Sequence, residues 1–165
     1  MSQKLSIATV AGIRLYVHWT FSLLVLWIIV SGVRAGSGAL DIAWSLLFVL
    51  SMFTCVVLHE LGHALAARRY GIKTRDITLL PIGGVASLES MPEKPSEELV
   101  VALAGPAVNF VIALLLLPVV SALPNPSQVE QLNTIHAGNF LLALLSVNLV
   151  LALFNLLPAF PMDGG

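Results

Sequence analysis

The run from Ile42 to Leu58 contains seventeen residues without a charged side chain, and this feature limits the possible folds most strongly. Ordinary soluble domains interrupt such runs, because about a quarter of their residues are charged. In this chain 10% of residues are charged, 58% are hydrophobic and the mean hydropathy is +0.94. A helix that crosses a bilayer needs about 20 apolar residues. The sequence therefore predicts a mainly α-helical, polytopic membrane protein.

We expect the chain to form one membrane-embedded unit over residues 1–165, with four transmembrane helices at about 18–34, 42–68, 99–122 and 139–157. Two further segments have β-like patterns. Residues 4–17 alternate polar and apolar side chains, which predicts one short strand at the membrane surface. Residues 76–89 read as strand, glycine turn and strand, which predicts a short β-hairpin or small sheet on the cytoplasmic side. Its unpaired edges cannot face lipid, so it must line a cavity walled by protein or water.

The basic residues predict the orientation. With four spans, Arg34 alone lies on one side, and the other side carries Lys4, Arg14, Arg68, Arg69, Lys73, Arg75 and Lys94. The basic side faces the cytoplasm, so we expect a multi-pass protein of the cell membrane with a cytoplasmic N-terminus. The lipid bilayer is one expected partner. Nucleic acid is not, because the chain has no basic cluster with aromatic side chains beside it.

The segment His59-Glu60-Leu61-Gly62-His63 directly follows the uncharged run and has the H-E-x-x-H pattern of zinc metalloproteases. Residues four apart share one face of a helix, so His59 and His63 can bind one Zn²⁺. Glu60 then lies beside the open coordination position as a general base. A chance match on a packed helix is a poor alternative, because ionisable side chains within spans are costly and rare.

A catalytic zinc ion usually has three protein ligands and one water, so a third ligand is expected. His18 and His136 are candidates by type, but both lie at the ends of spans. Asp163 fits better, because Pro158 and Pro161 prevent the last apolar span from continuing as regular helix. The interrupted backbone can direct the Asp163 carboxylate sideways towards the metal.

Four motifs occur in a family-specific order: HELGH (59–63), PIGGVASLE (81–89), AGPAVN (104–109) and NLLPAFPMDGG (155–165). In these motifs the chain resembles the site-2 proteases, a family of zinc-dependent intramembrane metalloproteases. The resemblance implies His59, His63 and Asp163 as ligands, Glu60 as base, and Asn155 as a group that stabilises the developing oxyanion. The family's core continues past the D-G-G motif with further helices, so we expect this chain to be incomplete at its C-terminus.

The expected function is hydrolysis of peptide bonds within or near transmembrane segments of membrane proteins, as in regulated intramembrane proteolysis, with one Zn²⁺ per chain. The substrate must be unwound, because a helical peptide bond is shielded by its own hydrogen bonds. An extended segment could then add to a strand edge. This reasoning predicts six substrate-binding residues: Gly83, Gly84, Val85, Ala86, Ser87 and Leu88.

Two other functions remain open from the residues alone. A membrane metal transporter or sensor also places histidines and a carboxylate in spans, but it distributes them along a path. An inactive scaffold that only binds transmembrane helices would not need Glu60. Within the site, Asn155 could simply cap the interrupted backbone. Asn109 is expected to hydrogen-bond between helices rather than contact the substrate.

Overall fold

The computed structural model describes residues 4–90, 94–122 and 135–156. Within them the protein is mainly helical, with one small mixed sheet. In chain order the elements are β1 (Lys4–Val10), β2 (Ile13–His18), α1 (Thr20–Arg34), α2 (Ala39–Arg69), β3 (Thr74–Leu80), β4 (Gly83–Leu88), α3 (Pro95–Ser121) and α4 (Phe140–Leu156). Asp163 lies outside the described residues.

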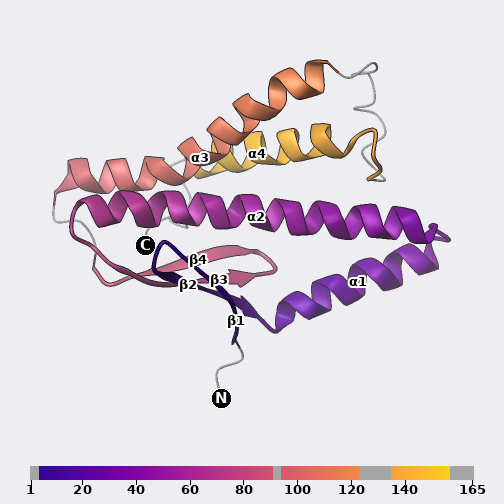
Figure 1. The fold of residues 1–165 in the computed structure, drawn as a ribbon, viewed down its shortest axis with the longest axis horizontal. Coiled ribbons are helices and arrows are strands. Elements are labelled where there is room, and N and C mark those ends of the chain that lie inside the picture. The colour runs from indigo at the N-terminus through magenta and orange to yellow at the C-terminus, as the bar shows by residue number, and fades with distance from the viewer. Residues whose placement is uncertain (1–3, 91–93, 123–134, 157–165) are drawn as a thin grey trace.

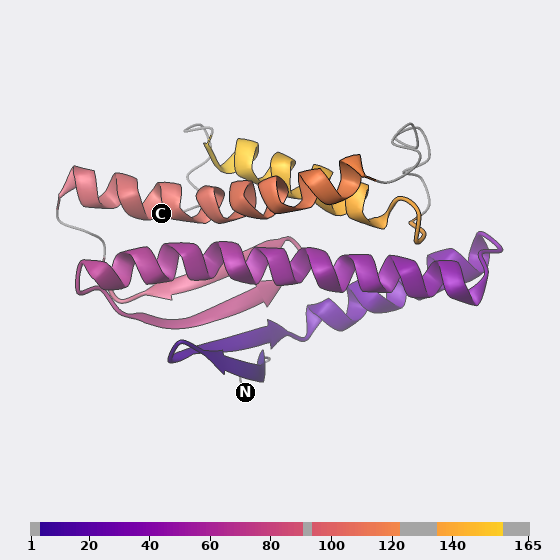
Figure 2. The same ribbon diagram turned by 45° about the horizontal axis from the view of Figure 1, so that its top comes forward.

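Helix α2 is the central element of the fold. The sheet and α1 lie on one side of it, and the pair α3 and α4 lies on the other, as Figures 1 and 2 both show. Helices α2 and α3 are long and apolar enough to cross a membrane, whereas α1 and α4 are shorter apolar helices. Large apolar side chains stay exposed on the outer helices, for example Trp27 at 66% and Leu115 at 68%. Such surfaces fit contact with lipid rather than water.

Both ends of α2 have local causes. At its start, the Asp41 carboxylate accepts a hydrogen bond from the backbone N–H of Gly38 at 3.2 Å. At its end, Gly71 has a φ of +80°, a conformation that favours glycine. This conformation lets the N–H of Ile72 donate to the carbonyl of Ala67 at 3.2 Å. The chain is thereby turned back towards β3.

The sheet has the strand order β1-β2-β3-β4, so β1 and β4 are its edges. Strands β2 and β3 are parallel, and the other two pairs are antiparallel. The prediction of a single strand over 4–17 is wrong, because this segment is a hairpin that turns at Ala11 (φ 51°) and Gly12 (φ 84°). A two-residue turn with both φ angles positive preserves the polar-apolar alternation on either side, which concealed it in the sequence.

The sheet packs its apolar face on the C-terminal half of α2. Ile13, Leu15 and Ile77 from the sheet form one buried cluster with Leu61 and Ala64 from the helix. Because Leu61 and Ala64 flank the second histidine of the H-E-x-x-H segment, this cluster holds the sheet directly beside that segment. The edge strand β4 is consequently brought next to the candidate site.

Helix α3 packs closely on the opposite side of α2. A Cβ added to Gly62 would lie 2.7 Å from the carbonyl oxygen of Ala104, so only a glycine allows this approach. Helix α3 begins at Pro95 and contains Pro106 and Pro118 in its interior. Figure 1 shows that α3 changes direction along its length, as an interior proline predicts.

Candidate active site

The H-E-x-x-H segment lies in the buried half of α2. His59, Glu60 and His63 expose only 4%, 6% and 6% of their surfaces. The two histidines are one helical turn apart, and their Nε2 atoms approach to 3.1 Å. The pair therefore converges on one point, as ligands of a single ion must.

This geometry fits a zinc ion. Two imidazole nitrogens bound to one tetrahedral zinc at 2.0–2.1 Å are separated by about 3.3 Å. The Nδ1–H of His63 donates to the carbonyl oxygen of Val101 at 2.7 Å, which leaves the Nε2 lone pair facing His59. In the part of the chain that the structure describes, no third His, Cys, Asp or Glu joins this pair. The predicted third ligand, Asp163, lies outside that part.

The ring of His63 is held by packing as well as by its hydrogen bond. Gly105 on α3 lies against the ring so closely that an added Cβ would overlap its Nε2 atom. Val101 and Gly105 are four residues apart and so lie on one face of α3. That face fixes both the position and the rotation of His63.

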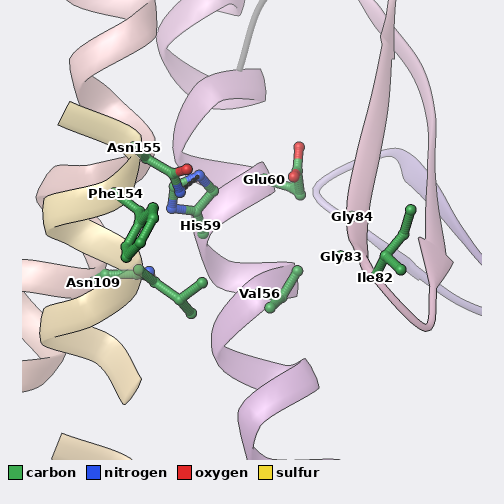
Figure 3. A pocket seen from close by; sticks show the side chains of 10 residues that line it. Val56, His59, Glu60, Ile82, Gly83, Gly84, Asn109, Phe154 and Asn155 are labelled. Atoms are coloured by element: carbon green, nitrogen blue, oxygen red, sulfur yellow. Dashed lines mark hydrogen bonds between the residues drawn. The ribbon is translucent and has the colours of Figure 1, made fainter. Parts of the chain in front are cut away.

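Glu60 points to the other side of α2, towards the sheet. A Cβ added to Gly84 would lie 2.6 Å from Cγ of Glu60 and 2.9 Å from its Oε1. The edge strand β4 therefore approaches the Glu60 carboxylate with the backbone of Gly84, and among the described residues no side chain lies between them. Figure 3 shows Glu60 between α2 and the hairpin residues Ile82, Gly83 and Gly84.

Asn155, near the end of α4, also belongs to this site. Its Nδ2 lies 3.3 Å from Nε2 of His59, a distance that joins residues 96 positions apart in the chain. Figure 3 shows the Asn155 side chain beside the His59 ring. The side-chain amide is thus within reach of any group bound where the two histidines converge.

A cavity of about 390 Å³ opens beside these residues. Its walls come from α2, α3, α4 and the β3–β4 hairpin, with the lining residues Val56, His59, Glu60, Ile82, Gly83, Gly84, Asn109, Leu151, Phe154 and Asn155. Of the predicted substrate-binding residues, Gly83 and Gly84 line this cavity. The other four, Val85, Ala86, Ser87 and Leu88, lie farther along β4 and do not.

Sequence reasoning missed two features of the site, and one of its expectations was wrong. The carbonyl of Val101 belongs to the backbone and has no sequence signal. The role of Gly105 was hidden within a motif that indicated only close helix packing. The expected interhelical hydrogen bond of Asn109 is wrong: the residue is 0% exposed, yet neither polar atom of its side chain has a partner among the described residues.

Together, a buried H-E-x-x-H helix, a small sheet against its carboxylate and a shell of apolar helices define a membrane-type metallopeptidase core. Comparison with known proteins agrees. The sequence model of peptidase family M50 matches residues 47–134, which is more than half of the chain. The chain belongs to this family, the site-2 proteases.

A zinc metalloprotease of Methanocaldococcus jannaschii is 42% identical over 165 residues, which are 100% of this chain and 44% of that protein. Stage IV sporulation protein FB of Bacillus subtilis is 30% identical over 118 residues, covering 71% of this chain and 37% of that protein. The solved structure of the site-2 protease from M. jannaschii matches with a TM-score of 0.71 and 38% identity, over 98% of this chain and 68% of that one. The chain thus spans less than half the length of these two curated relatives.

Proposed function

We propose that the protein is an intramembrane zinc endopeptidase, which cleaves peptide bonds within or near transmembrane segments as in regulated intramembrane proteolysis. The observation that carries this proposal is the convergence of the His59 and His63 Nε2 atoms at 3.1 Å on an apolar helix, with Glu60 facing a cavity. Family membership and the zinc metalloprotease among its relatives support the same chemistry.

The proposed topology has four spans, formed by α1 to α4, in the cell membrane. The N-terminus lies in the cytoplasm, because seven of the eight basic residues fall on that side. The apolar exposed surfaces of α1, α3 and α4 support contact with lipid. The sheet packs on α2, and the first two residues of its edge strand β4 line the cavity. In the proposed topology the edge of β4 faces away from the lipid, where unpaired backbone groups are costly.

In this proposal His59 and His63, with Asp163 as the third ligand, hold one zinc ion per chain. The bound ion would polarise the scissile carbonyl and lower the pKa of an attacking water. Glu60 accepts the proton of that water and passes it to the leaving amine. Asn155 donates from Nδ2 to the developing oxyanion, a role that its 3.3 Å approach to His59 supports.

The proposed substrate is a transmembrane segment that has been unwound to an extended strand. Such a segment can add to the edge of β4 that no other described strand pairs with, so that residues 83–88 satisfy its backbone groups within the membrane. Gly83 and Gly84 line the cavity and allow the substrate to approach Glu60. The four residues beyond them would extend the pairing away from the cleavage point.

The experiment that tests this function measures zinc content and cleavage of a model transmembrane peptide by the purified protein. We expect about one zinc per chain, with weaker retention after Asp163→Asn and loss after replacement of both histidines by alanine. Full zinc occupancy after replacing all three ligands would remove the site from consideration. Zinc uptake into proteoliposomes without cleavage would instead indicate a transporter, and peptide binding without cleavage a scaffold.

A further inference from the structure

Asn109 on α3 is a buried polar residue whose hydrogen-bonding capacity is unused. Its side chain lines the 390 Å³ cavity together with His59, Glu60 and Asn155. It is 0% exposed, and in the described part of the chain neither Nδ2 nor Oδ1 has a hydrogen-bond partner. A buried amide without partners destabilises the fold, so its presence at a cavity wall requires a reason.

Asn109 lies on the same face of α3 as the two residues that support His63. Val101, Gly105 and Asn109 are spaced by four residues, so they lie along one face of the helix. Val101 accepts from His63, Gly105 packs on its ring, and Asn109 follows one turn farther on. The face of α3 that holds His63, a predicted zinc ligand, therefore also places the side-chain amide of Asn109 at the cavity wall.

Asn148 on α4 provides a contrast within the same molecule. It is also an asparagine with 0% exposure, but it does not line the cavity. Its Nδ2 donates to the carbonyl of Leu144 at 2.8 Å and to Sγ of Cys55 at 3.4 Å. The bond to Cys55 joins α4 to α2, which is the interhelical role that was expected of Asn109. Among the described residues, Oδ1 of Asn148 has no partner, whereas in Asn109 both polar atoms lack one.

The arrangement of the cavity indicates which ligand would use the Asn109 amide. Figure 3 shows Asn109, Phe154 and Asn155 on one side of the cavity, and the hairpin residues Ile82, Gly83 and Gly84 on the opposite side. An extended segment paired with β4 uses only one of its two edges. The N–H and C=O groups of its other edge face the α3 and α4 wall, where water is scarce and an unpaired group is costly.

We propose that the side-chain amide of Asn109 binds the backbone of the substrate on the edge opposite β4. A primary amide carries both donors and an acceptor, so it can pair with a peptide N–H, a peptide C=O or both. The substrate backbone is thereby held from two sides, by the sheet and by α3. This inference rests on the proposed function and specifies how the same site recognises any sequence that has been unwound.

The first test replaces Asn109 by leucine, which has nearly the same shape but no polar atoms, and uses Asn148→Leu as the matched control. For Asn109→Leu we expect kcat/KM for the transmembrane peptide to fall about tenfold, mainly through KM, the loss typical of one buried hydrogen bond. Zinc content should equal that of the parent. For Asn148→Leu we expect a lower thermal midpoint with an unchanged KM.

A second test locates the interaction on the substrate. Peptides in which one amide near the scissile bond is replaced by an ester lack a single N–H donor, and the carbonyl of the replaced bond is a weaker acceptor, so the series probes both groups. At one such position we expect the ester to impair cleavage by the parent protein but to cause no further loss in Asn109→Leu, which is the non-additivity of a direct contact. Equal, additive losses at every position would overturn the proposal.

Other outcomes separate this inference from the proposed function. Absence of zinc-dependent cleavage by the parent protein contradicts the proposed function itself. Cleavage by Asn109→Leu with parental kcat and KM contradicts only the role of Asn109. A fall in kcat with unchanged KM would indicate a bound water, and loss of zinc in both Asn109→Leu and Asn109→Ala would indicate a structural role; either result overturns the inference.

Discussion

The two sides of α2 differ in the contacts that they make with the residues of the H-E-x-x-H segment. On the side of α3, His63 is fixed by the carbonyl of Val101 at 2.7 Å and by direct packing against Gly105. On the side of the sheet, Glu60 meets the backbone of Gly84 and a cavity. His63 is thus closely packed, whereas Glu60 borders the cavity that α2, α3, α4 and the hairpin line together.

The difference corresponds to two chemical requirements. Metal ligands need a fixed geometry, which dense packing and a second hydrogen bond supply. A general base needs access to water and substrate, which the cavity beside Glu60 supplies. If this division is correct, changes on the α3 side will act on zinc affinity, and changes on the sheet side will act on turnover. Four predictions test the division, in order of decreasing effect.

The largest effect is expected for Glu60→Gln on the sheet side. This change keeps the shape of the side chain but removes the base, so cleavage should fall by about 10²–10⁴-fold while zinc content stays unchanged. Peptide-cleavage kinetics and metal analysis of the same preparation measure both quantities. Glu98→Gln, on the exposed first turn of α3, is the matched control. Parental turnover in Glu60→Gln would show that another group acts as base.

Gly84→Ala should lower turnover on the order of 100-fold, because displacement of a catalytic group by about 1 Å has effects of that size. The added methyl would lie 2.6 Å from Cγ of Glu60, so the carboxylate or the strand must move. Zinc content should remain at the parental level, since the atoms nearest the added methyl all belong to Glu60 and none to a histidine. Loss of zinc in this variant would show that the two sides are not independent.

Gly105→Ala is the corresponding change on the α3 side. The added methyl would overlap the His63 ring, so zinc affinity should fall by about 10–100-fold, as expected when the support of a ligand is disturbed. Titration with a competing chelator measures this affinity. Gly32→Ala is the control, because its methyl would meet Ile42 at 2.7 Å between α1 and α2, away from the site. If both variants bind zinc equally well, Gly105 does not position His63.

The smallest effect is a difference between substrates. Ala86→Pro fixes φ and removes one backbone donor from β4, which should disturb strand addition. We expect cleavage of a stable transmembrane helix to fall several-fold more than cleavage of a helix already weakened by glycine or proline. Equal cleavage of both substrates at the parental rate would contradict strand addition, whereas the zinc chemistry would be unaffected.

Much of this architecture could be predicted from the sequence because its causes are local. Long apolar runs predicted helices, and the spacing of His59 and His63 placed them on one helix face, where their Nε2 atoms are 3.1 Å apart. The glycine pair after Pro81 predicted a hairpin that lines a cavity, and Gly83 and Gly84 line one. The hairpin at Ala11 and Gly12 was missed, because alternation continues on both sides of so short a turn.

What the sequence determined by itself was the chemistry of the side chains and their order along each helix, since these depend on residue type and on a period of 3.6. Only the tertiary structure decided which groups meet across the fold. The contact of His63 with Val101 joins residues 38 positions apart and uses a carbonyl that every residue possesses. Asn109 and Asn148 are the same residue type in similar apolar helices, yet the amide nitrogen of Asn148 is hydrogen-bonded. Asn109 instead lines the cavity, and neither of its polar atoms has a partner among the described residues. That distinction arises from how α2, α3 and α4 pack together, because packing alone determines which buried polar groups find partners.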